Sequence, residues 1–191
     1  MMPRLPLIDP ANATGAAKPL LDAVGKKLGL VPNMTRAMAN SPAVLKAYLE
    51  FSGALAGASL SAKTRELVAL TVGEVNGCNY CLSAHTAIGG MLGLPGETLL
   101  AARQAKSDDP HTDAVLRLAR ALVLQRGLVS DADLRDARAA GVSDGQIAEI
   151  VATVALNVFT NWFNHVAETP VDFPAVEALP EQLAATSCGC R

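Results

Sequence analysis

Apolar positions recur along most of the chain with the spacing of helices, and short polar, glycine- or proline-containing breaks separate the runs. Ser41-Pro42 is a typical helix start, because serine can cap a helix and proline suits its first position. A second helix is expected after Ser61. Its run from residue 65 to residue 72 is apolar on nearly all sides, which predicts burial. Asn76-Gly77 ends this run, and a third helix should extend from about Cys78 to Leu92.

The second half of the chain continues the same pattern. Helical spacing resumes at about Gly96–Ala105, and Asp108-Asp109-Pro110 starts another helix. Ser130-Asp131 and Ser143-Asp144 are two further cap signals. The last predicted helix extends from Gln146 to about Ala167. No segment of useful length has strand periodicity and no close internal repeat is visible, so the sequence predicts an all-α helical bundle.

The length of 191 residues suits one domain, or one domain with extensions. We expect residues 1–40 to form an extended arm that leads into one short helix near Ala17–Leu28. Residues 41–174 should form the helical domain, and residues 175–191 a tail in which the pattern fades.

Composition narrows the function classes. Hydrophobic residues make up 50% of the chain and aromatic residues 4%, which favours closely packed helices. The net charge of −2 gives no electrostatic footprint for nucleic acid, so we expect no nucleic-acid partner. No apolar run reaches the roughly 20 residues that cross a bilayer, and the first residues lack the pattern of a secretory signal, so we expect a cytoplasmic protein without membrane contact. The four cysteines should then be reduced at rest.

The stretch from Cys78 to His85 carries the most specific chemistry. Cys78, Cys81 and His85 occupy positions i, i+3 and i+7, which share one face of a helix. This arrangement suits a disulfide that opens and closes beside a base, and it also suits a metal site. We expect Cys78, near the helix N-terminus, to have a lowered pKa. Cys81 should be more enclosed and within reach of His85.

A proton donor or acceptor is expected on the preceding helix. Glu66 and Glu74 are eight residues apart, close to two turns, so periodicity does not choose between them. A carboxylate on a buried helix is costly unless it is paired, and His85 is the obvious partner. We therefore expect a relay from carboxylate through water and imidazole to thiol.

The pattern Arg65-Glu66-Leu67-Val68-Ala69-Leu70, followed by Cys78-Asn79-Tyr80-Cys81 and His85, resembles the alkylhydroperoxidase D-like branch of the carboxymuconolactone decarboxylase superfamily. In that family a Glu precedes the CxxC by twelve residues and a His follows it by four. The downstream stretches 157–165 and 172–174 also look like the longer, peroxidase-related members. The resemblance covers about Ser41 to Pro174.

The resemblance implies a fold, an activity and residue roles. Cys81 would be the peroxidatic thiol and Cys78 the resolving thiol, with Glu66 and His85 as the proton relay. Members are all-helical homo-oligomers, as dimers, trimers or hexamers. The substrate would be a hydroperoxide and the electron donor an external dithiol, such as a thioredoxin-like protein or a lipoyl group, with no bound cofactor or metal. The best-known branch has His before the second Cys, where this chain has Tyr80.

Further residues and other readings stay open at this stage. Tyr80, Glu74, Asn161 and His165 are candidates for lining the site. A decarboxylase-like lyase acting on a lactone would not need the CxxC. A zinc or interaction protein is the other class: Cys78, Cys81 and His85 supply three ligands, and Glu66 or a tail cysteine would have to supply a fourth. Cys188 and Cys190 could exchange with the active disulfide or be incidental thiols at a chain end.

Overall fold

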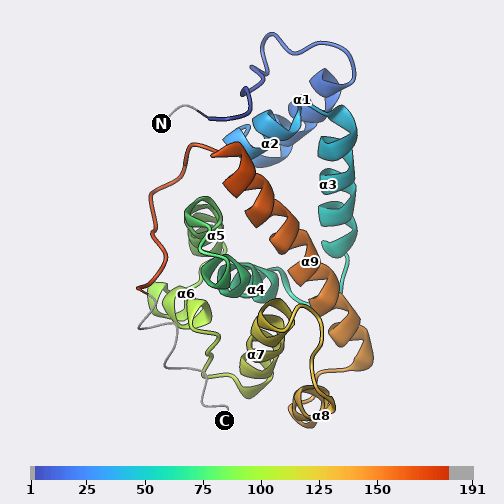
Figure 1. Ribbon diagram of the computed structural model, residues 1–191, viewed down its shortest axis with the longest axis vertical. Coiled ribbons are helices and arrows are strands. Elements are labelled where there is room, and N and C mark those ends of the chain that lie inside the picture. The colour runs from blue at the N-terminus through green and yellow to red at the C-terminus, as the bar shows by residue number, and fades with distance from the viewer. Residues whose placement is uncertain (1–2, 181–191) are drawn as a thin grey trace.

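The computed structural model describes residues 3–180, and all regular secondary structure in this range is helical (Figure 1). The elements are α1 (Ala17–Leu28), α2 (Asn33–Met38), α3 (Pro42–Leu55), α4 (Ala62–Val75), α5 (Asn79–Met91), α6 (Gly96–Arg103), α7 (Pro110–Leu124), α8 (Asp131–Ala139) and α9 (Asp144–Ala167). The expected all-α class is thus confirmed.

Helix α4 is at the centre of the packing. It contacts α5, α6, α7 and α9. The long helix α9 crosses the molecule diagonally, with α1 and α2 near its C-terminal end and α7 and α8 near its start (Figure 1). Because α4 is surrounded in this way, every residue from Leu67 to Glu74 is buried, as its apolar run predicted.

Two clusters of buried side chains make up the core. One joins α4, α6, α7 and α9 and includes Leu70, Val115 and Ile150. The other joins α1, α2 and α3 to the start of α5 and includes both thiols of the CxxC. Leu21 and Met38 belong to this second cluster. Part of the segment expected to be an arm therefore forms the packing around the cysteines.

The helix ends follow the polar cap signals with one exception. The Ser61, Ser130 and Ser143 side chains each accept a backbone N–H in the first turn, and those of Ser130 and Ser143 form reciprocal capping boxes. The predicted cap at Ser41 is wrong, since its side chain makes no such bond and only proline marks the start of α3. Helix α2 was not predicted, because its six residues are too few to show periodicity.

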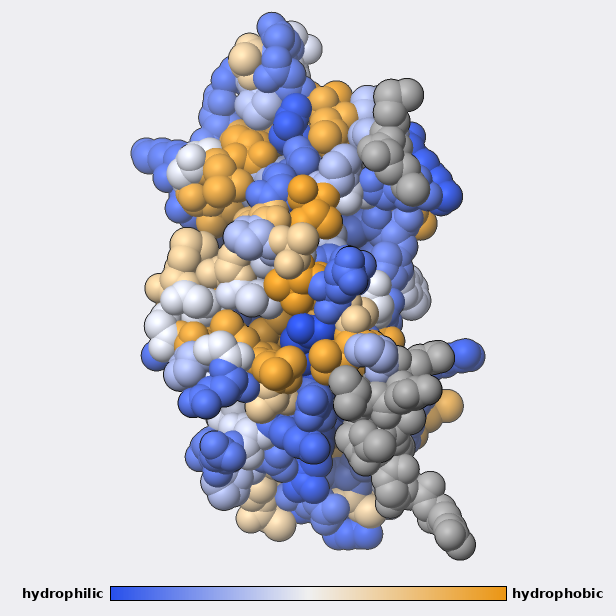
Figure 2. All heavy atoms as spheres, turned by 90° about the vertical axis from the view of Figure 1, so that its left-hand side faces the viewer, coloured by the Kyte–Doolittle hydropathy of each residue, from blue (hydrophilic) through white to orange (hydrophobic). Residues whose placement is uncertain are grey.

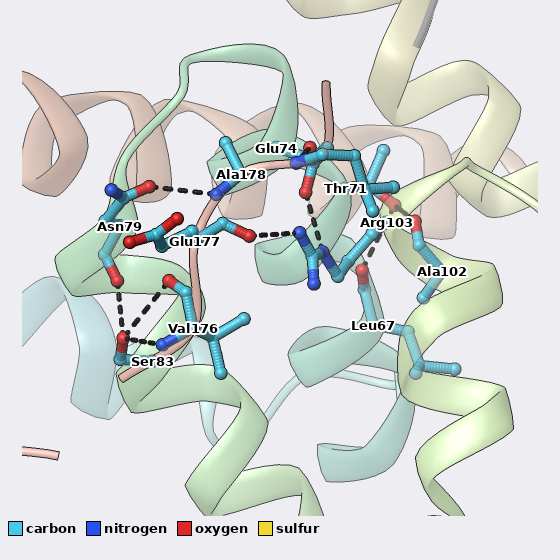
Figure 3. Close-up of polar contacts among 11 residues, drawn as sticks. Leu67, Thr71, Glu74, Asn79, Ser83, Ala102, Arg103, Val176, Glu177 and Ala178 are labelled. Carbon is cyan, nitrogen blue, oxygen red and sulfur yellow. Dashed lines mark hydrogen bonds and ion pairs between the residues drawn. The ribbon is translucent and has the colours of Figure 1, made fainter. Parts of the chain in front are cut away.

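The chain after α9 lies across α5 and α6 and is held there by hydrogen bonds (Figure 3). These bonds join Asn79 to Ala178, Ser83 to Val176, Arg103 to Glu177 and Glu74 to Leu179. The described part of the predicted tail is therefore fixed to the helix that carries the CxxC. Figure 2 shows this side of the molecule, where hydrophobic and hydrophilic residues are interspersed.

Within residues 3–180, no single helix has both the length and the apolar character needed to cross a membrane. Only α8 and α9 taken together meet that test of length and composition, and they are bent by 118° relative to each other.

Candidate functional site

The two cysteines of the CxxC lie at the first turn of α5. Gly77 has φ of +64°, a left-handed conformation that suits glycine, and it turns the chain between α4 and α5. Cys78 is then the N-cap residue, and its Sγ accepts a hydrogen bond from the Cys81 backbone N–H at 3.4 Å. Both residues are free thiols and almost fully buried. The i, i+3 spacing thus brings the two sulfurs to one turn of one helix.

The environment lowers the pKa of Cys81 to about 7. The hydrogen bond from Cys78 is the largest cause, and it outweighs the opposing effect of burial. The charge of His85 and the amides of Asn164 and Asn161 lower the pKa further. The same hydrogen bond to Cys81, together with burial, raises the pKa of Cys78. The expectation of a lowered pKa at Cys78 is therefore wrong, because donating to Cys81 and desolvation outweigh the backbone N–H groups at the helix start.

Glu66 is the carboxylate that meets the imidazole. Its Oε2 lies 2.6 Å from the Nδ1 of His85, and both side chains are mostly shielded from solvent. Burial acts to lower the pKa of His85, but the charge and hydrogen bond of Glu66, with the charge of Cys81, outweigh it and raise that pKa. Since Glu66 engages Nδ1, the opposite ring nitrogen is left for the cysteine side of the site.

Glu74 points away from the cysteines, which resolves the choice between the two carboxylates. Its Oε2 accepts a hydrogen bond from the Arg103 Nε at 2.7 Å, and its Oε1 accepts the Leu179 backbone N–H at 2.5 Å (Figure 3). The Glu74 side chain is 4% exposed and that of Arg103 10%. Glu74 therefore holds α4 and α6 to the segment that follows α9 (residues 176–179, the C-terminal segment) and does not line the site.

The last helix supplies two amides. The Asn164 Nδ2 lies 3.3 Å from the Cys81 Sγ, and Asn161 is fully buried beside it. His165, a candidate for lining the site, is exposed on the same helix. A sequence signal for Asn164 was present and missed: the buried polar residues of α9 form one helical stripe. They are Thr153, Asn157, Thr160, Asn161 and Asn164.

Tyr80 connects the CxxC turn to segments distant in sequence. Its hydroxyl accepts the Met34 backbone N–H at 3.1 Å, and its ring packs edge-on against Phe173 at 5.9 Å. Burial, with a further contribution from the Asp172 charge, raises the pKa of the Tyr80 phenol. Tyr80 is thus a neutral group in the wall of the site.

A cavity of about 510 Å³ opens in front of Cys81. Glu66, Tyr80, Cys81 and His85 line it. Much of the remaining wall is apolar and comes from α1, α3, α5 and α9, including Val24, Leu49, Leu55, Ile88 and Leu156. A volume of this size is typical of sites for organic ligands. The Cys81 side chain therefore faces a largely apolar space.

Tyr48 on α3 is a lining residue that the sequence did not reveal. Burial, followed by the charges of Glu66 and Cys81, raises its pKa to about 12. It is therefore a protonated hydroxyl donor in the cavity. In the sequence, Tyr48 is one of several apolar residues with helical spacing, so the spacing alone did not indicate that it lines a site.

The described part of the chain contains no group of three or more His, Cys, Asp or Glu residues placed to hold a metal ion. Of the residues considered for the zinc alternative, Cys78 and Cys81 are free thiols that are hydrogen-bonded to each other, and His85 is hydrogen-bonded to Glu66. Cys188 and Cys190, the other potential ligands, lie outside the described residues.

Comparison with known proteins agrees with this geometry. A sequence model of the carboxymuconolactone decarboxylase family matches residues 42–123, which include Glu66, both cysteines and His85. The comparison with curated proteins gives no match.

Solved structures share the fold over most of the chain. A peroxidase-related protein from Ralstonia eutropha JMP134, described as an alkylhydroperoxidase AhpD core, has a TM-score of 0.78 and 24% identity, over 90% of this chain and 93% of that one. A peroxidase-related protein from Silicibacter sp. TM1040 has a TM-score of 0.72 and 26% identity, and the match covers 95% of this chain and 92% of that one. A variant of the debrominase Bmp8, in complex with 2,3,4-tribromopyrrole, has a TM-score of 0.70 and 19% identity. The match covers 81% of this chain and 84% of that one.

The family match falls on the helices that carry the Glu66–His85 pair and the CxxC, and the shared fold extends to the helix that supplies the amides. Residues 42–123 therefore carry a domain of the carboxymuconolactone decarboxylase family, within a chain that shares the fold of alkylhydroperoxidase D-like, peroxidase-related proteins.

Proposed function

We propose that this protein is a thiol-dependent peroxidase that reduces organic hydroperoxides with Cys81 and Cys78. The superfamily is one of enzymes, and the observation that carries the proposal is the state of Cys81. It is a buried thiol with a pKa lowered to about 7, hydrogen-bonded by a second thiol and facing an apolar cavity. A thiolate is the nucleophilic form of cysteine, so this residue is poised for attack on a substrate in that cavity.

The proposed reaction uses each residue once. The Cys81 thiolate attacks the terminal peroxide oxygen, an S–O bond forms and the O–O bond breaks. Protonated His85, held by Glu66, gives its proton to the departing alkoxide. Cys78 then attacks the resulting sulfenic acid, which yields the Cys78–Cys81 disulfide and one water. A dithiol donor, thioredoxin-like or lipoyl, returns two electrons by thiol–disulfide exchange.

The cavity supports a preference for bulky hydroperoxides. Hydrogen peroxide would leave most of a 510 Å³ apolar space unfilled, whereas cumene hydroperoxide can bury its ring against the wall. We therefore expect a higher kcat/KM for cumene hydroperoxide than for hydrogen peroxide.

The decisive experiment follows hydroperoxide consumption with a dithiol as the electron donor. Wild type should turn over, Cys81→Ser should be inactive, and Cys78→Ser should stop after one event with a sulfenic acid at Cys81. A protein with Cys188→Ser and Cys190→Ser is the matched control, and we expect it to retain activity. A wild type that consumes no organic hydroperoxide, with Cys81 unmodified, would overturn the proposal.

A second candidate is reductive dehalogenation of a halogenated aromatic compound. The observation that favours it is the shared fold with Bmp8, whose variant was solved with 2,3,4-tribromopyrrole. Two thiols could supply the two electrons that replace a carbon–bromine bond by carbon–hydrogen, with release of bromide and formation of the disulfide. Bromide release from tribromopyrrole by reduced protein, lost in Cys81→Ser, would favour this reaction over peroxide reduction.

The lyase and zinc alternatives have tests of their own. A lactone-directed lyase would keep its activity when both Cys78 and Cys81 are replaced by serine. A zinc protein would contain stoichiometric zinc when purified without added metal, and its CxxC would not cycle between thiol and disulfide.

A further inference from the structure

Two asparagines of α9 face Cys81 with amides that the fold leaves partly unpaired. Asn161 is fully buried and Asn164 is 4% exposed. Within residues 3–180, neither the Asn161 Nδ2 nor the Asn164 Oδ1 has a hydrogen-bond partner. A buried polar group without a partner costs free energy. The unpaired Asn161 Nδ2 therefore suggests an acceptor that is present only during the reaction.

Neighbouring groups fix the direction in which each amide points. The Asn161 Oδ1 accepts a hydrogen bond from the Asn76 Nδ2 at 2.8 Å, so the unpaired Nδ2 is its free donor. The Asn164 Nδ2 lies 3.3 Å from the Cys81 Sγ and also 3.3 Å from the Met34 Sδ. One amide thus already donates to the reactive sulfur. The other lies near enough to help lower the pKa of Cys81, yet among the described residues its N–H has no acceptor in hydrogen-bonding geometry.

We propose that Asn164 holds the Cys81 sulfur as a thiolate and that Asn161 donates its free N–H to the oxygen which this sulfur gains. This inference rests on the proposed peroxidase function. When the S–O bond forms and the O–O bond of the hydroperoxide breaks, two electrons leave the sulfur and a new oxygen appears beside it. The Asn161 Nδ2 supplies a donor for that oxygen, so its partner arrives with the chemistry.

Amides suit this task better than a second imidazole. A hydrogen bond to an anion is stronger than one between neutral groups, and an amide N–H keeps its proton at every pH of interest. His85 gives up its proton in the proposed reaction. Asn161 and Asn164 therefore stabilise the sulfur anion and its oxidised form while the imidazole changes state.

The test separates this role from a purely structural one. In a full-length background with Cys78→Ser, Cys188→Ser and Cys190→Ser, Cys81 is the only cysteine. The thiolate absorbance then gives the Cys81 pKa without any peroxide. One equivalent of cumene hydroperoxide then converts Cys81 to the sulfenic acid. Dimedone traps the sulfenic acid that remains at successive times, and mass spectrometry of the adduct gives its lifetime. This lifetime measures how well the new oxygen is stabilised. His165→Leu is the matched control, since His165 is on the same helix but exposed.

We expect Asn164→Leu to raise the Cys81 pKa enough to reduce the thiolate fraction at neutral pH about tenfold. Asn161→Leu should shorten the sulfenic acid lifetime about tenfold, as expected for the loss of one hydrogen bond, with a smaller effect on the pKa. His165→Leu should change neither. If Asn161→Leu does not fold, Asn161→Asp keeps the shape and the bond to Asn76 and should shorten the lifetime likewise.

Unchanged pKa and lifetime in folded Asn161 and Asn164 variants would assign these amides a structural role and overturn the inference. Its failure is distinguishable from that of the proposed function. If the wild-type chain forms no sulfenic acid with any hydroperoxide, the peroxidase and the role of Asn161 fail together, while the thiolate titration still decides the role of Asn164.

Discussion

At the scale of single residues, the reactivity expected of Cys81 comes from its neighbours. Burial alone would raise its pKa, yet the hydrogen bond from Cys78 and the charge of His85 lower it to about 7. Glu66 in turn keeps His85 protonated above its usual pH range. Both shifts favour the pair of thiolate and imidazolium over the pair of neutral groups, which is the state that the proposed reaction requires.

This coexistence predicts a bell-shaped dependence of kcat/KM on pH. The rate should rise through a pH of about 7 as Cys81 ionises, and fall at higher pH as His85 loses its proton. Glu66→Gln removes the charge that raises the His85 pKa, so the alkaline limb should move to lower pH. Stopped-flow rates of Cys81 oxidation across pH measure both limbs. An alkaline limb that does not move in Glu66→Gln would contradict the relay.

At the scale of elements, α5 is held from both sides. Tyr80 ties its first turn to α2 through the Met34 backbone, and the C-terminal segment bonds to Asn79 and Ser83 on its outer side. The Glu74–Arg103 pair anchors the same segment to α4 and α6 (Figure 3). The position of the cysteines therefore depends on contacts from both ends of the chain.

The buried pair gives a stability prediction. Arg103→Met leaves the buried Glu74 carboxylate without its cation and should reduce the free energy of unfolding by about 3 kcal/mol. The control is Arg117→Met: Arg117 pairs with Asp113 at 3.0 Å but is 68% exposed. Arg117→Met should reduce the free energy of unfolding by less than about 1 kcal/mol. Urea denaturation measures the free energy of unfolding of both variants, and equal losses would contradict a stabilising role for the buried Glu74–Arg103 pair. Restoration of stability by Glu74→Leu in Arg103→Met would support it.

Helix capping gives a second prediction at this scale. Ser143→Ala removes both the cap of α9 and its capping box, and should cost about 1 kcal/mol of unfolding free energy. Ser41→Ala is the matched control, because the Ser41 side chain makes no cap hydrogen bond at the start of α3. Thermal unfolding of the two variants compares them. A loss at Ser41 as large as that at Ser143 would show that the capping geometry does not decide stability.

At the scale of the whole molecule, α9 has two faces. The inner face carries Asn161 and Asn164, and the outer face exposes an apolar stripe with helical spacing. The stripe consists of Val151, Phe159, Trp162 and Val166, which are 46%, 40%, 63% and 64% exposed. Exposed apolar patches of this kind mark interaction surfaces. We propose that this stripe packs against a second copy of the chain in a homo-oligomer.

This proposal predicts a mass above that of the monomer in light scattering. Trp162→Glu places a charge in the stripe and should lower the mass, because a buried, unpaired carboxylate is costly. Leu128→Glu is the control, since Leu128 is 83% exposed and lies between α7 and α8, away from the stripe. It should leave the mass unchanged. A monomeric wild type would contradict the proposal.

The sequence by itself determined the helical class, most helix boundaries and the shared helix face of Cys78, Cys81 and His85. These features are local: a helix with a period of 3.6 residues, capped by serine or proline, fixes which side chains share a face. The spacing within α5 therefore brought Cys78, Cys81 and His85 together before any tertiary contact was considered.

Only the tertiary structure decided what depends on contacts between distant segments. Helical periodicity alone leaves Glu66 and Glu74 equivalent, and the fold separates them because His85 of α5 meets one while Arg103 of α6 meets the other. Which thiol ionises follows first from the hydrogen bond between the two thiols, and then from burial, the charge of His85 and the hydrogen bonds that reach Cys81 from α9. The contributions of burial and of α9 have no local signature, because electrostatic and desolvation effects depend on the groups that pack nearby in space.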